Sequence, residues 1–327
     1  MGGECVSGWL MPLVYSGVTW KTRLYNYIWA PLSSPIEALR FCWRYDVFLV
    51  PDHALPLGYW IKKWRSSARV IYFNHGPFLA DLRRQPWYFR GYIQMMLGAV
   101  DGVHSGSWLP DRYAEGILLV PRTISHLFAG EEFEGICRDS SAENLAIVAA
   151  LHATKGIREG IAAFQAFSDR LGRPVTLTII GDGPLRKEVE RFASTNGGIR
   201  LLGQQPQSVV AAELAKSSVL LMLSRFDTFP AAVLEAARIG VLPLMSDNVG
   251  SSNLFPTELV VPVGDHQAAV ERLLWLYQLS TSEQEALRDR VRVVAREFTR
   301  ERQCAEFRAA MNDLLQRIGA NGDRLKV

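Results

Sequence analysis

The chain has 327 residues, of which 48% are hydrophobic and 21% charged, enough for two globular domains with complete cores. Its formal net charge of +3 is too small for a broad nucleic-acid-binding surface. Four scattered cysteines argue against a zinc site or a disulfide framework and favour a reducing, cytoplasmic compartment. No apolar run is long enough to span a bilayer, and the N-terminus lacks the basic start of a signal peptide.

The N-terminal third is unusually aromatic, since eight of the nine tryptophans lie before residue 110. Two stretches, 59–65 and 82–90, interleave aromatic residues with lysine and arginine. This composition is typical of a protein that lies on an anionic membrane surface, where rings sit at headgroup level and cations meet phosphates. A tryptophan-rich core with a solvated basic edge explains the same residues equally well.

Short apolar strands that end in polar loops follow one another through the first half, in FLVPDH, VIYFNHGPF, AVDGVHSGSW and ILLVPRTISHLF. His75 comes just after the second of these strands, and His53 follows the first. A histidine on a strand-end loop can donate a hydrogen bond to a substrate oxygen and can act in either protonation state. A lone histidine is more often a satisfied core residue, so His75 is a candidate and His53 a weaker one.

Strands and helices alternate in the second half, which predicts doubly wound sheets. An apolar strand at 144–150 leads to Lys155-Gly156, which opens an amphipathic helix. The next strand runs into the tight turn Gly181-Asp182-Gly183-Pro184, whose glycines permit a positive φ. A third strand ends at Leu202-Gly203, before Gln204.

The segment 219–247 places a carboxylate on each side of a strand-to-helix loop. Asp227 follows an apolar strand at 219–223, and Glu235 lies about a turn and a half into the helix 230–239, which stops at Gly240. Ligands bind at this edge of an open α/β sheet, and a helix start favours a phosphate. Two acceptors beside such a helix start suit a sugar nucleotide, whose hydroxyls need acceptors and whose diphosphate needs donors.

The sequence SRFDTFPAAVLEAARIGVLPL resembles the retaining glycosyltransferases of family 4, the group 1 glycosyl transferases of the GT-B class. The hallmark of that family is two glutamates separated by seven residues, and here Asp227 replaces the first. The resemblance runs from about Asp46 to the C-terminus and is strong from Asn144 to Leu273. It implies an α/β GT-B fold, in which two Rossmann-like, doubly wound domains face a cleft.

The resemblance also implies the domain organisation. Residues 1–143 are expected to form the acceptor-side domain, 144–298 the nucleotide-sugar domain, and 299–327 a C-terminal helix that crosses back to the first domain. The family begins with a strand followed by a Gly-Gly loop under the diphosphate. This sequence begins at Gly2-Gly3, so either its start is misplaced or the N-terminal domain is shortened and lacks its first strand.

Site residues are carried over from the family one by one. The Lys155-Gly156 pair matches a family motif whose lysine neutralises the leaving diphosphate. The family usually has an arginine five or six residues before that lysine, where this sequence has Ala149 or Ala150. His152, Arg158 or Arg225 would have to supply the missing positive charge. The expected catalytic residues are His75, beside the reacting end of the sugar, and Asp227, which contacts the sugar. The expected donor-binding residues are Gly2 and Gly3 under the diphosphate, Lys155, Gln204 at the base, the loop residues Phe229, Pro230 and Ala231, and Glu235 at the ribose.

The implied reaction is transfer of a sugar from a nucleoside diphosphate to an acceptor hydroxyl with retention, on a lipid-linked or polysaccharide precursor. No protein nucleophile is evident, so the leaving phosphate would accept the proton. No metal and no cofactor are expected, because no Asp-x-Asp pair is present. The expected location is the cytoplasm, with peripheral attachment to the inner face of the cell membrane. Two alternatives stay open, a non-catalytic GT-B protein that binds a sugar nucleotide or a partner chain, and a sugar-nucleotide epimerase.

Overall fold

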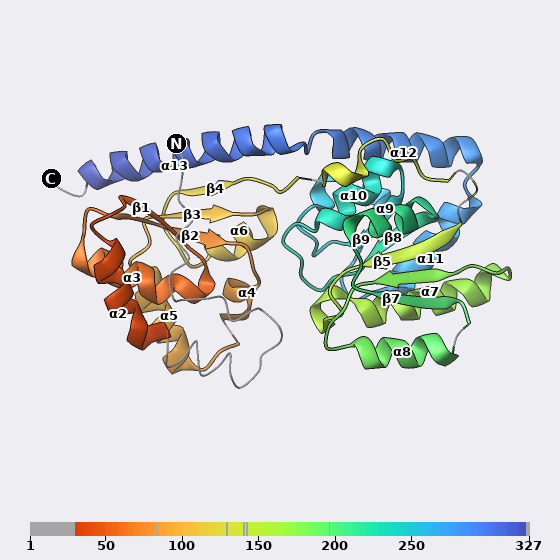
Figure 1. Ribbon diagram of the computed structural model, residues 1–327, viewed down its shortest axis with the longest axis horizontal. Coiled ribbons are helices and arrows are strands. Elements are labelled where there is room, and N and C mark those ends of the chain that lie inside the picture. Colours follow the sequence, from red (N-terminus) through yellow and green to blue (C-terminus); the bar gives the residue numbers. More distant parts are fainter. Residues whose placement is uncertain are drawn as a thin grey trace. The chain divides into compact units, whose positions relative to one another are not determined.

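The computed structural model describes residues 30–324, except 83, 129, 140, 142 and 196. Contacts divide the chain into two units (Figure 1), the first made of residues 1–125 and 307–327 and the second of residues 126–306. The sequence predicts a boundary between the two domains at residue 143, whereas the contacts place the boundary between the units after residue 125. Among the described residues, no helix is both long and apolar enough to cross a membrane.

Unit 1 is built on a parallel sheet with the strand order β1-β2-β3-β4. Because the strands pair in the order in which they follow along the chain, the described part of this sheet winds in one direction. The strands are β1 (Val47–Val50), β2 (Arg69–Asn74), β3 (Gly102–Ser105) and β4 (Arg122–Ile124). The helices that join or flank them are α2 (Ala30–Phe41), η2 (Asp52–Ala54), α3 (Leu55–Trp64), α4 (Phe78–Leu82), α5 (Trp87–Leu97) and α6 (Trp108–Glu115).

Side chains of β2 alternate between the two faces of this sheet, as the period of a strand requires. Val70 and Tyr72 are buried in a cluster that also contains Ile61 of α3 and Ile93 of α5. Ile71 faces the other way and packs against Met311, Leu314 and Ile318 of helix α13 (Arg300–Arg324). In Figure 1, α13 accordingly lies on the opposite side of the sheet from α2 and α3.

Unit 2 contains a six-stranded parallel sheet with the order β10-β9-β8-β5-β6-β7. Its strands are β5 (Asn144–Val148), β6 (Leu177–Ile180), β7 (Ile199–Gly203), β8 (Ser217–Met222), β9 (Leu242–Ser246) and β10 (Val260–Val261). Its helices are η3 (Glu131–Phe133), η4 (Ala153–Lys155), α7 (Ile157–Leu171), α8 (Arg186–Thr195), α9 (Gln207–Ala215), α10 (Ala231–Ile239), η5 (Ser252–Leu254), η6 (Thr257–Leu259), α11 (His266–Gln278) and α12 (Thr281–Arg296). Helices α7 and α8 lie on one side of the sheet and α9, α10 and α12 on the other (Figure 1), which confirms the predicted doubly wound arrangement.

The strand order of unit 2 locates its ligand edge. The chain winds outward from β5 to β7 and then returns to β8, so the order reverses between the neighbouring strands β5 and β8. All residues of β8 are buried, as expected for a central parallel strand covered on both faces. Helix α10 stops at Gly240, as predicted, and this residue caps the helix with a left-handed φ of 87°. In open α/β sheets, ligands bind outside the carboxyl ends of the strands at such a reversal.

Candidate functional site

Glycines let the loops after β5 and β8 approach each other closely. Gly156 has a φ of 65°, and a Cβ added there would lie 1.8 Å from the carbonyl oxygen of Leu223. The amide of Arg225 donates a 2.8 Å hydrogen bond to the carbonyl oxygen of Thr154. The loop that carries Lys155 is therefore joined directly to the loop that carries Asp227.

Lys155 and Asp227 form an ion pair at the point where the strand order reverses. Their Nζ and Oδ2 atoms lie 2.6 Å apart, and the side chains are 28% and 12% exposed. The backbone holds Asp227 in place, because its amide donates to Asn248 at 3.2 Å and its carbonyl accepts from Gly250 at 2.8 Å. Two residues that are 72 positions apart in sequence thus form one fixed, partly accessible charged pair.

Helix α10 begins beside this pair. Pro230 is its N-cap and makes no side-chain cap hydrogen bond, and Ala231 is the first helical residue. The ring of Phe229 is buried, with its centroid 4.8 Å from that of His126 and 5.6 Å from that of Phe298. Phe229 therefore anchors the loop through its side chain, so a ligand would meet this segment through its backbone and the helix start.

Glu235, the predicted ribose acceptor, is only 5% exposed and has protein partners within unit 2. Burial raises the pKa of its carboxyl, while hydrogen bonds from the backbone of Gly130 and the side chain of Gln207 lower the pKa. Gln207, the first residue of α9, was not selected from the sequence, although it lies three residues after the predicted Gln204. Gln204 itself is exposed after the edge strand β7, two strands away from β5.

The three residues that could replace the family's arginine all have partners in the structure. Arg158 binds Glu188 through two hydrogen bonds of 2.6 and 2.7 Å. Arg225 binds Glu159 at 2.6 Å. His152 lies with Nδ1 3.0 Å from the hydroxyl of Thr154. Lys155 differs from them because its partner is the candidate carboxylate itself.

A second group of polar residues gathers at the carboxyl ends of the strands of unit 1. His75 Nε2 lies 3.1 Å from His104 Nδ1, and His104 Nε2 lies 2.7 Å from Ser125 Oγ. The ring of His75 stacks on Phe73 with a centroid distance of 3.8 Å. These contacts connect the strands β2, β3 and β4 through one line of hydrogen-bonding side chains.

The predicted donor-binding residues Gly2 and Gly3 lie outside the described residues.

Burial controls the protonation of this group. Burial lowers the pKa of His75 to about 4, and burial together with the neighbouring His75 lowers the pKa of His104 to about 4. Both rings are therefore neutral at pH 7, and each carries one N–H. Burial also raises the pKa of Asp52 to about 6, against a hydrogen bond from the hydroxyl of Tyr72 that lowers it.

These shifts predict a pH-dependent stability of unit 1. Between pH 6 and 4 the unfolded chain takes up protons at His75 and His104 that the folded chain does not, whereas folded Asp52 keeps a proton that the unfolded chain has lost. The unfolded chain therefore binds about one proton more than the folded chain, so stability should decrease as the pH is lowered from 6 to 4, by about 1.4 kcal/mol per pH unit. Asp52→Asn removes the group whose proton opposes the effect of the two histidines, so the stability of this variant should change with pH about twice as steeply as that of the wild type.

Denaturation at pH 4 to 7, followed by tryptophan fluorescence, measures the two slopes. Five of the six described tryptophans lie in unit 1, so the signal reports on that unit. His53 and Asp111 also have shifted pKa values, but they contribute equally to both proteins. Equal slopes in wild type and Asp52→Asn would contradict the assignment of a protonated Asp52.

Comparisons with known proteins agree with this architecture. The family model described as Glycosyl transferases group 1 matches residues 142–279, the segment that contains Lys155, Asp227 and Glu235. No curated protein sequence matches the chain.

Three similar solved structures come from different bacteria. A UDP-forming trehalose-phosphate synthase from Burkholderia xenovorans is 16% identical, with a TM-score of 0.73 over 88% of this chain and 78% of that one. A sucrose-phosphate synthase from Thermosynechococcus elongatus is 15% identical, with a TM-score of 0.74 over 93% and 82%. A trehalose-6-phosphate structure from E. coli bound with UDP-2-fluoro glucose is 14% identical, with a TM-score of 0.72 over 87% and 77%. At these identities the likeness concerns the fold, and the fold class defined is GT-B, as predicted.

Proposed function

We propose that the protein is a retaining glycosyltransferase of family 4, which moves a sugar from a nucleoside-diphosphate sugar to an acceptor hydroxyl. The observation that carries the proposal is the Lys155–Asp227 pair at the reversal point between β5 and β8. The pair lies within the segment that matches the group 1 glycosyl transferase model. The sugar nucleotide named for the E. coli neighbour supports this class of donor.

In the proposed mechanism, the incoming diphosphate replaces Asp227 as the partner of Lys155 and lies at the start of α10. The released carboxylate of Asp227 then accepts a hydrogen bond from a hydroxyl of the transferred sugar. The bond from the anomeric carbon to the phosphate oxygen breaks, and a bond to the acceptor oxygen forms on the same face. The departing phosphate oxygen takes the acceptor's proton, so no protein base, metal or cofactor is included.

Two groups would contribute most to the rate. Lys155 and the backbone amides of α10 stabilise the negative charge that develops on the departing diphosphate. His75 presents a neutral imidazole, fixed in orientation by His104 and Phe73, which can hydrogen-bond a substrate oxygen. Because each unit fixes its own groups before reaction, these groups lose little entropy when a substrate binds.

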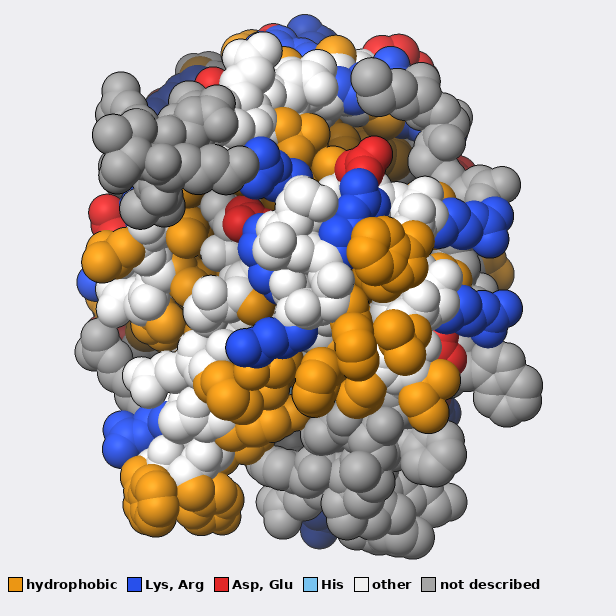
Figure 2. Space-filling model, turned by 90° about the vertical axis from the view of Figure 1, so that its left-hand side faces the viewer, with side chains coloured by type: hydrophobic (Ala, Val, Ile, Leu, Met, Phe, Trp, Pro, Cys, Tyr) orange, Lys and Arg blue, Asp and Glu red, His pale blue; other side chains and the backbone are white. Residues whose placement is uncertain are grey.

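The proposed location is the cytoplasm, at the inner face of the cell membrane. The structure corrects one part of the membrane argument, because Lys62 donates to Asp101 at 2.7 Å and Arg65 binds Asp46, so neither cation is available for lipid. Exposed apolar side chains remain in unit 1, among them Trp43 at 70% and Trp64 at 45%. Figure 2 shows one face of the molecule, on which hydrophobic and basic side chains are mixed. Flotation with anionic vesicles at low salt tests the attachment, and protein that stays in the soluble fraction would contradict it.

A non-catalytic sugar-nucleotide-binding protein is the second candidate. It is favoured by the existing partners of the site, since Lys155 is already paired with Asp227 and Glu235 already accepts hydrogen bonds from Gly130 and Gln207. Ala149 and Ala150 also leave the family's arginine position without a charge. Both candidates share donor binding and differ in turnover.

Donor binding is tested by calorimetry with a series of nucleoside diphosphates. Lys155→Ala and Glu235→Ala should each weaken binding by about 1.5–3 kcal/mol, the value of a hydrogen bond to a charged group. Lys216→Ala is the matched control, because this lysine directly precedes β8, at the opposite end of that strand from the Asp227 loop, and its side chain is 61% exposed, so binding should be unchanged. Unchanged affinity in both site variants would remove the donor-site assignment.

A further inference from the structure

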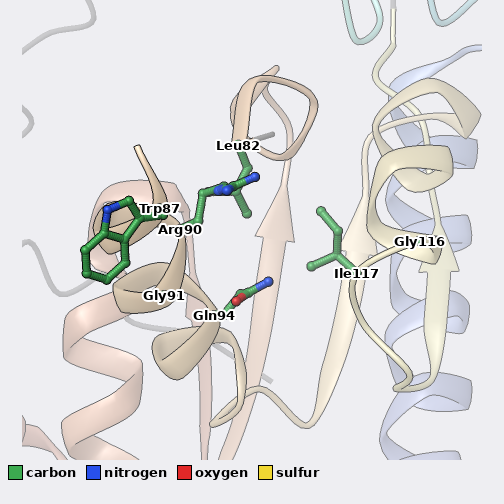
Figure 3. Close-up of a pocket in the computed structure, with 7 residues that line it drawn as sticks. All are labelled: Leu82, Trp87, Arg90, Gly91, Gln94, Gly116 and Ile117. Atoms are coloured by element: carbon green, nitrogen blue, oxygen red, sulfur yellow. The ribbon is translucent and has the colours of Figure 1, made fainter. Parts of the chain in front are cut away.

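Within the part of the chain that the structure describes, helix α5 leaves one of its faces open. Trp87, Arg90, Gly91 and Gln94 follow the spacing i, i+3, i+4, i+7, which places them on one face of a helix. This face lines a pocket of about 420 Å³, closed on its other sides by Leu82 of α4 and by Gly116 and Ile117 after α6 (Figure 3). The volume lies in the range of small-molecule sites, and all of the lining belongs to unit 1.

Within the described residues, no packing contact requires a glycine at position 91. A glycine inside a helix destabilises the helix relative to alanine. A Cβ added at Gly91 would meet nothing within 4 Å, whereas one added at Gly58 of α3 would lie 2.9 Å from Val70. Packing therefore accounts for Gly58 but not for Gly91. Because glycine has no side chain, Gly91 leaves room for a ligand in the part of the pocket that it lines.

The polar groups of the pocket suit an anion that carries hydroxyls. Arg90 and Gln94 both point from α5 into the space in front of Leu82 and Ile117 (Figure 3). Arg90 is exposed and forms no ion pair with any carboxylate in the described part of the chain. Its planar guanidinium can bind a phosphate through two hydrogen bonds, and an amide such as that of Gln94 can both donate to and accept from a hydroxyl.

Exposed aromatic surface lies next to the pocket, at its lining residue Trp87 and at the neighbouring Tyr88. Trp87 is 78% exposed and Tyr88 61% exposed, and their ring centroids lie 6.0 Å apart in an edge-to-face arrangement. Exposed rings with one polar end are suited to sites that are partly apolar and partly wet. The apolar side chains of Leu82 and Ile117 could cover the less polar face of a bound ring.

We propose that this pocket binds a phosphate-bearing saccharide, with the phosphate on Arg90 and a sugar hydroxyl on Gln94. The choice of a saccharide rests on the proposed function, because a glycosyltransferase acts on sugar-containing molecules. The same chemistry is presented by a free sugar phosphate and by the phosphorylated sugar headgroup of a lipid. Gly91 and Gly116 allow the ligand to approach the backbone.

Two probes distinguish these sources. Calorimetry with glucose 6-phosphate tests the free form, and flotation with phosphatidylcholine vesicles that contain phosphatidylinositol 4-phosphate, against phosphatidylcholine alone, tests the lipid form. Arg90→Ala should weaken binding of the effective probe about ten- to a hundredfold, as expected for a charge-assisted hydrogen bond. Gly91→Phe should abolish binding by filling the pocket without changing the charge.

Arg84→Ala is the matched control, since Arg84 is 86% exposed, precedes α5 and does not line the pocket. It removes the same charge and should leave binding within about twofold. Gly91→Ala should raise the melting temperature, which reports folding independently of any ligand. Binding of neither probe, or binding that survives both Arg90→Ala and Gly91→Phe, would overturn the proposal. Nucleoside diphosphate binding, measured in the same variants, should be unchanged, so failure of the donor site and failure of this pocket are separate results.

Discussion

Gly156→Ala is expected to destabilise unit 2 by about 3–5 kcal/mol. The left-handed backbone at this position, with a φ of 65°, accounts for about 1–3 kcal/mol of that cost. The remainder is steric, because the new Cβ would overlap the Leu223 carbonyl oxygen and would have to push the loops after β5 and β8 apart. The same movement would separate Lys155 from Asp227, so donor binding should be lost along with stability.

Gly172→Ala separates the two contributions. Gly172 ends helix α7 with a φ of 69°, but a Cβ there would meet nothing within 4 Å. Its alanine variant should therefore show only the backbone cost, about 1–3 kcal/mol. Chemical denaturation of both variants measures the difference, and equal losses would mean that the contact between the two loops is not as tight as described.

Asp227→Ala is expected to lower the rate of sugar transfer about a hundred- to a thousandfold, the usual cost of removing one group that stabilises a transition state. The fold should be retained, because the backbone hydrogen bonds of Asp227 to Asn248 and Gly250 do not involve its side chain. Asp227→Glu restores the family's residue and should raise the rate with hexose donors. A lower rate in Asp227→Glu than in an active wild type would show that the pocket is fitted to aspartate.

Local patterns predicted the elements of unit 2 closely. The apolar run 219–223 lies largely within β8, and the helix expected at 230–239 is α10, which stops at Gly240 as predicted. The helix expected after Lys155-Gly156 is α7, and both Gly181 and Gly183 have the positive φ that the predicted turn permits. These features depend on backbone conformation and on hydrophobic periodicity, which neighbouring residues in the sequence determine.

Contacts between distant residues could not be predicted in the same way. The basic stretch at 59–65 indicated a membrane surface, but Lys62 binds Asp101, 39 residues further along the chain. Glu235 was predicted to bind a ribose, but it accepts a hydrogen bond from the backbone of Gly130. This contact could not be predicted, because Gly130 belongs to a segment that carries no motif. His104 lies in the segment AVDGVHSGSW, where no neighbouring residue distinguishes it from a core histidine. Only the pairing of β2 with β3 in the sheet brings it beside His75.

The central claim is that the Lys155–Asp227 site catalyses release of a nucleoside diphosphate from a sugar nucleotide. The most direct measurement is incubation of the wild-type protein with a panel of nucleoside-diphosphate sugars and a mixture of acceptor sugars and sugar phosphates. Nucleoside diphosphate release is followed enzymatically, and the anomeric configuration of the product by proton NMR. The proposal predicts release from at least one donor, with the donor's configuration kept and with release lost in Lys155→Ala. Tight nucleoside diphosphate binding without release from any donor, or a product of inverted configuration, would contradict it.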